Sequence, residues 1–322
     1  MEEVREILSR ADKKSTTGLD LSGRGLTEFP QELFEFKNLS FLNLSNNKLT
    51  EIPARVGEMI VLEHLNLCSN RLTTLPPEIG NISSNLNKLL LCFNKITSLP
   101  PQIGKLTCLH RLMIRNNGLT SIPAEIGELY YLTDLWLQGN KLTELPNEIG
   151  KLTNLTHLRL ANNILETLPA GIGGLESLRE LDVYNNYLRT FPAEIGQLYN
   201  LKHIKACDNN ITELPDEIGD LQHLEEFELF DNRIDTMPSS IGKLTNLVSL
   251  KLVRNRLTSL PKTIGQLPNL LTLVLDQNAI SSLPANFGQL TSLQYLSLDE
   301  NDIADFPMEI TKLKNLRDLS IQ

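Results

Sequence analysis

The sequence has 322 residues, a length that allows two or three domains of ordinary size. A formal net charge of -9 and a pI of about 5.2 argue against nucleic acid as a partner, because nucleic-acid binding depends mainly on neutralising phosphate charges. Aromatic residues make up only 5% of the chain and leucine fills most apolar positions, a bias that is unusual for a globular enzyme. No segment has 18 consecutive uncharged apolar residues, so we expect no membrane insertion.

Residues 1–14 form the first predicted element. Val4, Ile7, Leu8 and Ala11 recur at helical spacing, which predicts an amphipathic capping helix over the open face of the first repeat. The segment lacks the apolar stretch and the small-residue cleavage site of a signal peptide, so we expect a cytoplasmic protein.

Residues 15–322 repeat with a period of 23 residues. The template L-x-x-L-x-L-x-x-N-x-L is followed by T-x-L-P-x-x-I-G-x-L, and one step of the series has 24 residues. This pattern predicts thirteen full repeats and a truncated last one. The asparagine of the template stands at Asn47, Asn70, Asn94, Asn117, Asn140, Asn163, Asn186, Asn209, Asn232, Asn255, Asn278 and Asn301.

Each position of the template has a structural explanation. Alternation places Leu135 and Leu137 inward on a short strand, while Trp136 faces outward. The asparagine amide is expected to form hydrogen bonds with the backbone groups that the following turn leaves unpaired. The proline pre-sets the return segment, and the glycine is expected to be the left-handed residue that ends a single helical turn.

A coil of this kind cannot bury enough apolar surface alone, so the repeats must stack. We therefore predict an α/β leucine-rich-repeat solenoid, curved like a horseshoe, with a parallel concave sheet of about 14 short strands. The 24-residue step, over residues 81–85, is interpreted as an insertion on the outer side. The last strand, with Leu316, Leu319 and Ile321, has no polar cap after it. Either the chain is cut there, or another surface covers that edge, for instance a second copy in a homodimer.

The template LPxxIGxLxxLxxLxLxxNxL runs almost without gaps from Pro30 to Ile321. It resembles the intracellular Ras-group leucine-rich-repeat family, of the Shoc-two scaffold and Ras suppressor type. The resemblance implies Ras-type signalling, with a concave surface that binds a Ras-type small GTPase and a phosphatase catalytic subunit. The scaffold's phosphatase-docking motif of the Arg-Val-x-Phe kind does not occur in these residues, so the resemblance supports the phosphatase less directly.

Outward-facing strand positions are free of packing constraints, and their composition therefore bears on function. Apolar and aromatic side chains with neighbouring arginines fall on consecutive strands, a composition typical of a binding hot spot. The alternative is that a few exposed apolar residues occur on any protein surface. The candidate partner-binding residues of this group are Leu90, Phe93, Met113, Arg115, Trp136, Arg159 and Tyr184.

A second candidate region is acidic. Glu226, Glu228 and Asp231 surround Phe230 and could receive a basic face of a partner. The alternative is an ordinary solvated acidic face. Lys251 then reverses the sign of the charge, and alternating patches suit protein partners better than a uniform polyanion.

The sequence does not predict catalysis, a cofactor or a metal centre. His64, His157 and His203 share one column, but even the nearest pair is two strand spacings apart, which is too far for common zinc ligands. Cys68 and Cys92 fall on adjacent strands, where a disulfide is geometrically conceivable, although we expect the cysteines of a cytoplasmic protein to stay reduced.

The sequence therefore favours a non-enzymatic scaffold or adaptor that binds protein partners on its concave face. The alternative is the recognition portion of a larger multidomain enzyme, a kinase or a ubiquitin ligase, whose catalytic part lies outside these residues. A longer open reading frame would distinguish the two.

Overall fold

The computed structural model describes residues 2–82 and 85–322. Residues 83 and 84, within the predicted outer insertion at residues 81–85, lie outside the described part of the chain. The chain divides into two compact units, residues 1–158 and 159–322. Each unit is a stack of repeats.

Every repeat contributes one strand of three residues, whose central residue is apolar and, except for Leu319 of β14, buried in the stack. The strands are β1 (Gly18–Asp20), β2 (Phe41–Asn43), β3 (His64–Asn66), β4 (Lys88–Leu90), β5 (Arg111–Met113), β6 (Asp134–Trp136), β7 (His157–Arg159), β8 (Glu180–Asp182), β9 (His203–Lys205), β10 (Glu226–Glu228), β11 (Ser249–Lys251), β12 (Thr272–Val274), β13 (Tyr295–Ser297) and β14 (Asp318–Ser320).

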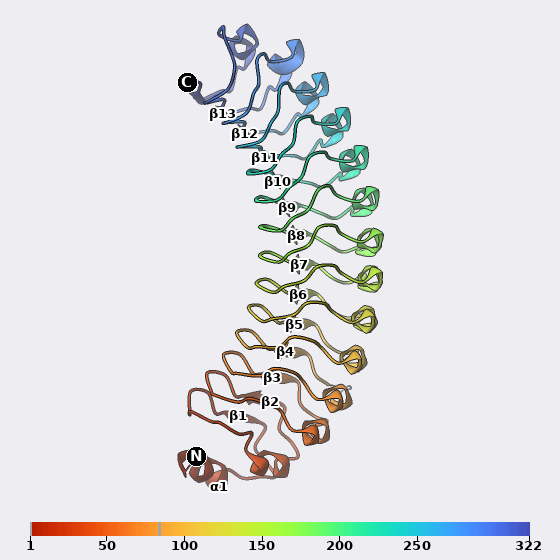
Figure 1. Ribbon diagram of the computed structural model, residues 1–322, viewed down its shortest axis with the longest axis vertical. Helices are drawn as coiled ribbons and strands as arrows, with labels where there is room; N and C mark the ends of the chain where they lie inside the picture. The colour runs from red at the N-terminus through yellow and green to blue at the C-terminus, as the bar shows by residue number, and fades with distance from the viewer. Residues whose placement is uncertain (1, 83–84) are drawn as a thin grey trace. The chain divides into compact units, whose positions relative to one another are not determined.

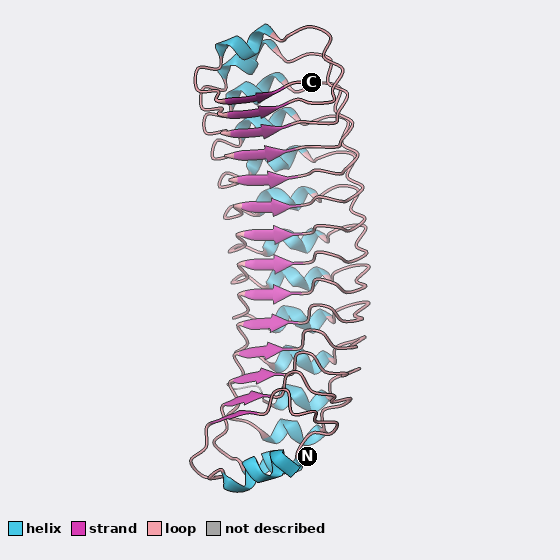
Figure 2. Ribbon diagram, turned by 90° about the vertical axis from the view of Figure 1, so that its left-hand side faces the viewer, coloured by secondary structure: helices cyan, strands magenta, loops and turns pink. Residues whose placement is uncertain are grey.

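The strands of each unit lie side by side in chain order and run parallel (Figure 2). In the first unit, for example, Leu89 of β4 pairs with Leu112 of β5, which pairs with Leu135 of β6. In the second unit, β8 to β14 continue the same register, one repeat to the next. Figure 1 shows that each stack bends toward its strands. The predicted leucine-rich-repeat solenoid with parallel strands is confirmed.

The opposite side of each stack is built from short 3-10 turns, one for each predicted helical turn (Figure 1). Each turn follows a proline whose φ lies between -64° and -71°, because the proline ring restricts this angle. The turns are η1 (Gln31–Glu35), η2 (Ala54–Glu58), η3 (Pro77–Asn81), η4 (Pro101–Lys105), η5 (Ala124–Glu128), η6 (Asn147–Lys151), η7 (Ala170–Gly174), η8 (Ala193–Gln197), η9 (Asp216–Asp220), η10 (Ser239–Lys243), η11 (Lys262–Gln266), η12 (Ala285–Gln289) and η13 (Met308–Lys312).

The role predicted for the repeated glycine is wrong. The glycines of the 3-10 turns do not have a positive φ, and the left-handed glycines among the described residues are Gly23, Gly25 and Gly139. Glycine is required instead because consecutive turns approach closely. A Cβ atom on Gly219 would lie 2.4 Å from the carbonyl oxygen of Ser240 in the next turn. Most left-handed residues occupy the position directly before the template asparagine.

The template asparagines form a buried ladder that links consecutive repeats. The Nδ2 of Asn209 donates to the carbonyl oxygen of Val183 at 2.9 Å and to that of Ala206 at 3.2 Å. Its Oδ1 accepts from the backbone N–H of Leu188 at 3.0 Å. The same pattern recurs in the other repeats, for instance at Asn70. Each amide thus satisfies backbone groups that a turn would leave unpaired.

The N-terminal helix α1 spans Glu2–Arg10 and packs with Val4 and Leu8 buried. Its polar face forms ion pairs with the first repeat, including Arg24 with Glu3. Among the described residues, no helix is both long and apolar enough to span a bilayer.

Candidate functional site

The first candidate surface lies on the strand side of the first unit. We define the aromatic patch as Leu90, Phe93, Met113, Arg115 and Trp136. The strand register pairs Leu90 with Met113 and Met113 with Trp136, so these three side chains occupy the same position on three adjacent strands. All three are half-buried.

Phe93 stands in the left-handed turn position of its repeat, with φ 57°. Most repeats place Asn, Asp, Ser or Gly there, residues that tolerate this conformation better than a bulky aromatic residue does. Phe93 is nevertheless 46% exposed, so burial does not explain the choice. The guanidinium carbon of Arg115 lies 5.0 Å from the centre of the Phe93 ring, within range of a cation–π contact. Phe93 is thus an exposed aromatic residue in a backbone conformation that bulky side chains disfavour.

Positive charge borders the aromatic patch. Arg111 on β5 forms an ion pair with Asp134 on β6, with 3.4 Å between Nε and Oδ2. In residues 2–82 and 85–322, no carboxylate forms an ion pair with Arg115. The side chain of Arg115 instead contacts the Phe93 ring and Cys92.

Two predicted residues, Arg159 and Tyr184, belong to the second unit. Nη2 of Arg159 lies 3.5 Å from Oε2 of Glu180. The exposed side chain of Tyr184 follows β8, and the charge of nearby Asp208 raises the pKa of its phenol. The pKa of Asp182, the last residue of β8, is raised mainly because burial disfavours its charged form.

We define the acidic patch as Glu226, Glu228, Phe230 and Asp231 of the second unit. Each carboxylate has a basic side chain close to it within the chain. Glu226 lies 3.4 Å from Nδ1 of His203, and Glu228 lies 2.8 Å from Nζ of Lys251. The acidic patch is therefore partly compensated, and it is less available to a basic partner than the sequence suggested.

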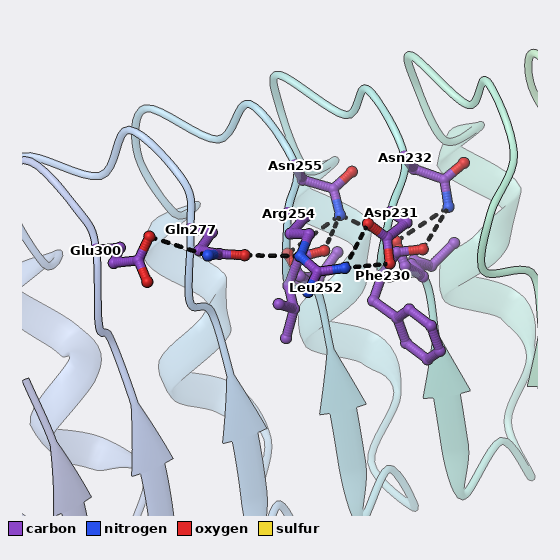
Figure 3. A network of polar contacts seen from close by, with 10 residues as sticks. Phe230, Asp231, Asn232, Leu252, Arg254, Asn255, Gln277 and Glu300 are labelled. Carbon is purple, nitrogen blue, oxygen red and sulfur yellow. Dashed lines mark hydrogen bonds and ion pairs between the residues drawn. The ribbon is translucent and has the colours of Figure 1, made fainter.

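Asp231 is also part of a ladder of turn side chains (Figure 3). Nη1 of Arg254 lies 3.2 Å from the carboxylate of Asp231, and its Nε donates to Gln277 at 2.7 Å. Gln277 in turn donates to Glu300 at 2.9 Å. The four residues occupy the left-handed position in consecutive repeats, so their side chains run along one edge of the stack.

The structure also exposes aromatic residues that sequence reasoning did not select. Tyr130, Tyr131 and Tyr199 follow 3-10 turns, and Tyr187 follows a template asparagine. Alternation identifies outward positions only on strands, so the sequence contained no signal for exposure at these sites. The ring of Tyr131 stacks on that of His110, with 6.0 Å between the ring centres.

The described residues contain no cluster of three or more His, Cys, Asp or Glu side chains arranged to hold a metal ion. His64, His157 and His203 belong to β3, β7 and β9. His157 lies 3.5 Å from Asp134, and His203 pairs with Glu226.

Comparisons with known proteins agree with this architecture. A family model described as a leucine-rich repeat region matches residues 102–207, 191–258 and 249–322, and a second repeat model matches 38–59 and 61–82. A solved leucine-rich-repeat protein from Leptospira interrogans is 36% identical, with 99% of this chain and 86% of that chain covered and a TM-score of 0.84. No curated protein matches the chain.

Two plant receptors are also similar. The peptide hormone receptor RGFR1, solved in complex with RGF2, is 30% identical with a TM-score of 0.79, covering 95% of this chain and 52% of that one. The Arabidopsis receptor kinase HAESA was solved with the peptide hormone IDA and the co-receptor SERK1. It is 26% identical with a TM-score of 0.70, and the match covers 95% of this chain and 63% of that one. The chain thus spans between half and two thirds of the receptor chains it matches.

Proposed function

The chain belongs to the leucine-rich-repeat family, and from this premise we propose that it is a non-enzymatic scaffold or adaptor that captures protein partners on its strand side. One observation carries the proposal. Leu90, Met113 and Trp136 stand in one register on adjacent strands of the first unit, and Phe93 and Arg115 follow two of these strands and contact each other.

The chemistry of the aromatic patch suits a protein or peptide. Large apolar side chains supply area that a partner can bury, and an arginine beside them adds a directional charged contact. The similar receptors RGFR1 and HAESA were solved with peptide hormones, which supports a partner of this class.

A finer proposal concerns the pathway. The repeat template supports a cytoplasmic role in Ras-type signalling, with a Ras-type small GTPase as partner and, less directly, a phosphatase catalytic subunit. A carboxylate of such a partner would face Arg115.

The test replaces both Met113 and Trp136 by alanine and measures binding to purified Ras-type GTPases and to partners captured from a native lysate. Capture should fall at least tenfold, which corresponds to about 1.4 kcal/mol. The matched control is Val274→Ala, which truncates a half-buried residue at the same strand position in the second unit and should leave capture unchanged. Unchanged capture by the double variant would refute the aromatic patch as the site, and capture without any Ras-type GTPase would refute the finer proposal.

A second candidate is the recognition portion of a larger enzyme, supported by the likeness to part of the receptor kinase HAESA. A longer open reading frame that encodes a catalytic domain would establish it. Homodimerisation through the apolar side chains of the last repeat, including Leu319, remains a proposal that light scattering would test.

A further inference from the structure

Cys68 and Cys92 lie side by side on the strand side of the first unit. Cys68 comes two residues after the end of β3, and Cys92 comes two residues after the end of β4. The last residues of these strands, Asn66 and Leu90, are paired in the sheet. The backbone N–H of Cys92 points at Sγ of Cys68, with 3.2 Å between nitrogen and sulfur. Both thiols are free. Cys68 is half-buried, whereas Cys92 is only 5% exposed.

The third member of this column is Arg115, which occupies the same position one repeat further on. The hydrogen bond from the Cys68 side chain, together with Arg115, lowers the pKa of Cys92 to about 6, against the effect of burial. The proton shared with Cys92 is retained on Cys68, and the pKa of Cys68 is raised accordingly. The pair therefore favours a thiolate on Cys92 beside a thiol on Cys68, the combination that promotes thiol oxidation to a disulfide.

The environment of Cys207 shows the opposite behaviour. Burial is the main reason that the pKa of this thiol is raised to about 12, and nearby Glu228 adds to the effect. Cys207 is consequently an internal reference for an unreactive buried cysteine in the same chain.

We propose that Cys68 and Cys92 form a reversible oxidation site at which a hydroperoxide converts the two thiols into an intramolecular disulfide. The thiolate sulfur of Cys92 attacks one peroxide oxygen, the O–O bond breaks, and a sulfenic acid and hydroxide form. The sulfur of Cys68 then attacks the sulfenic sulfur, the S–O bond breaks, and water leaves. Both sulfurs are oxidised and the peroxide is reduced, so that two thiols and one hydrogen peroxide give one disulfide and two waters.

The geometry permits this bond without separating the repeats. Neighbouring strands are about 4.8 Å apart, and this spacing falls within the roughly 4.4–6.8 Å found between the Cα atoms of disulfides. Closing the bond requires the two Cβ atoms to approach from a strand spacing of about 4.8 Å to the roughly 3.5–4.5 Å of disulfides, and a bond under such strain should be easily reduced by dithiols. A bond of this kind suits a reversible switch better than a structural staple.

Oxidation would also change the aromatic patch. Cys92 directly precedes Phe93, and the thiolate of Cys92 is a negative neighbour of Arg115, which stacks on Phe93. Loss of the thiolate removes that neighbour and strengthens the attraction of Arg115 for an acidic partner. This consequence rests on the proposed function, whereas disulfide formation does not.

The test treats the full chain with hydrogen peroxide at pH 7, alkylates the remaining thiols and maps the peptides by mass spectrometry. We expect a linked Cys68–Cys92 peptide pair that is two hydrogens lighter, alkylated Cys207, and full reversal by dithiothreitol. Loss of the free Cys92 thiol should be at least about tenfold faster than loss of the Cys207 thiol, since only thiolates react rapidly.

Variants separate this pairing from general oxidation. Cys108→Ser removes a half-buried thiol outside the column and should leave the linked pair unchanged. Cys68→Ser removes the resolving thiol, so Cys92 should accumulate as sulfenic or sulfinic acid. The proposal is overturned if, in the parent chain, the thiols of Cys68 and Cys92 can still be alkylated after Cys108 has been oxidised. It is also overturned if the parent chain forms only disulfide-linked dimers. The mass readout does not involve a partner, so it can succeed even if the aromatic patch binds nothing.

Discussion

The guanidinium of Arg254 contacts the carboxylate of Asp231 at 3.2 Å, although both residues hold left-handed backbone turns with φ of 52° and 54°. The other side of the same guanidinium reaches Gln277 in the following repeat (Figure 3). One side chain therefore links three consecutive turns, and its backbone conformation is one that most side chains disfavour. The side-chain contacts of Arg254 stabilise the fold, whereas its left-handed backbone destabilises it. Substitutions of Arg254 can therefore measure the two effects separately.

Arg254→Ala and Arg254→Gly should differ in stability. Both remove the contacts with Asp231 and Gln277, which are worth less than about 1 kcal/mol because the arginine side chain is 61% exposed. Only glycine relieves the left-handed backbone, a gain of about 1 kcal/mol. Urea unfolding should therefore show Arg254→Gly to be more stable than Arg254→Ala by about this amount. Asn46→Gly, at an equivalent position with φ 56°, should gain less, since asparagine tolerates this conformation. Equal stability of the two Arg254 variants would contradict the strain argument.

The fold could be predicted from the sequence because every repeat has the same pattern of apolar residues, asparagine and proline. Alternating leucines identify the strands, and the recurring asparagine identifies the buried ladder seen at Asn70 and Asn209. The reason for the glycine could not be found in this way. A residue pattern does not distinguish a left-handed backbone from a close approach between turns, and only the distance from Gly219 to Ser240 does so.

The candidate site was predictable in part for the same reason. Strand alternation places Leu90, Met113 and Trp136 in one column, and their register in the structure follows. Charge compensation was not predictable, because whether Glu228 meets a cation depends on the side chain of Lys251 one repeat away. The left-handed backbone of Phe93 was also unforeseen, although its place before an asparagine of the template contained the signal.

Asn209→Ala should destabilise the chain strongly. The change leaves the buried N–H of Leu188 without its acceptor, whereas the carbonyl oxygen of Val183 loses one donor and keeps the amide of Asn186 at 3.1 Å. The stranded N–H costs about 1–3 kcal/mol, and the lost bonds to carbonyl oxygens add to it, so the total loss should be about 2 kcal/mol. The measurement is the free energy of unfolding in urea.

Asn200→Ala is the matched control for this prediction. Asn200 also donates to a backbone carbonyl of the preceding repeat, that of Glu176 at 2.8 Å, but it is exposed. Water can replace its hydrogen bond, so the loss should stay below about 1 kcal/mol. A similar loss in the two variants would show that burial does not determine how much the asparagine hydrogen bonds contribute to the free energy of unfolding.

Gly219→Ala should cost about 2–3 kcal/mol of unfolding free energy. The new Cβ would lie 2.4 Å from a backbone oxygen of Ser240, and the adjoining turn must move to relieve the overlap. Gly118→Ala provides the comparison, because a Cβ there meets its nearest atom, the oxygen of Ile96, at 3.5 Å. That variant should remain within about 0.5 kcal/mol of the parent. A neutral Gly219→Ala would mean that neighbouring turns separate without cost.

Asp182→Asn should stabilise the chain at pH 7. Burial raises the pKa of this carboxyl group above its unfolded value, so the folded state disfavours the carboxylate. Below the unfolded pKa, both states are protonated and the variant should match the parent. As the pH rises through the unfolded and then the folded pKa, the parent loses stability relative to the variant, and the difference becomes constant above that range. An asparagine oxygen can still accept from the N–H of Tyr184, as Asp182 does at 3.1 Å.

Asp20→Asn should show the opposite sign in the same experiment. Hydrogen bonds, first that from the Ser22 side chain, lower the pKa of Asp20, so its carboxylate stabilises the folded state above the unfolded pKa. That contribution is lost as the pH falls through the lowered folded pKa, and the asparagine variant should be the less stable one at pH 7 but not at pH 2. Unfolding midpoints in urea between pH 2 and pH 8 measure both variants. If both shift in the same direction at pH 7, a general charge effect explains them better than the local environments of the two carboxyl groups, since each removes one negative charge from a chain of net charge -9.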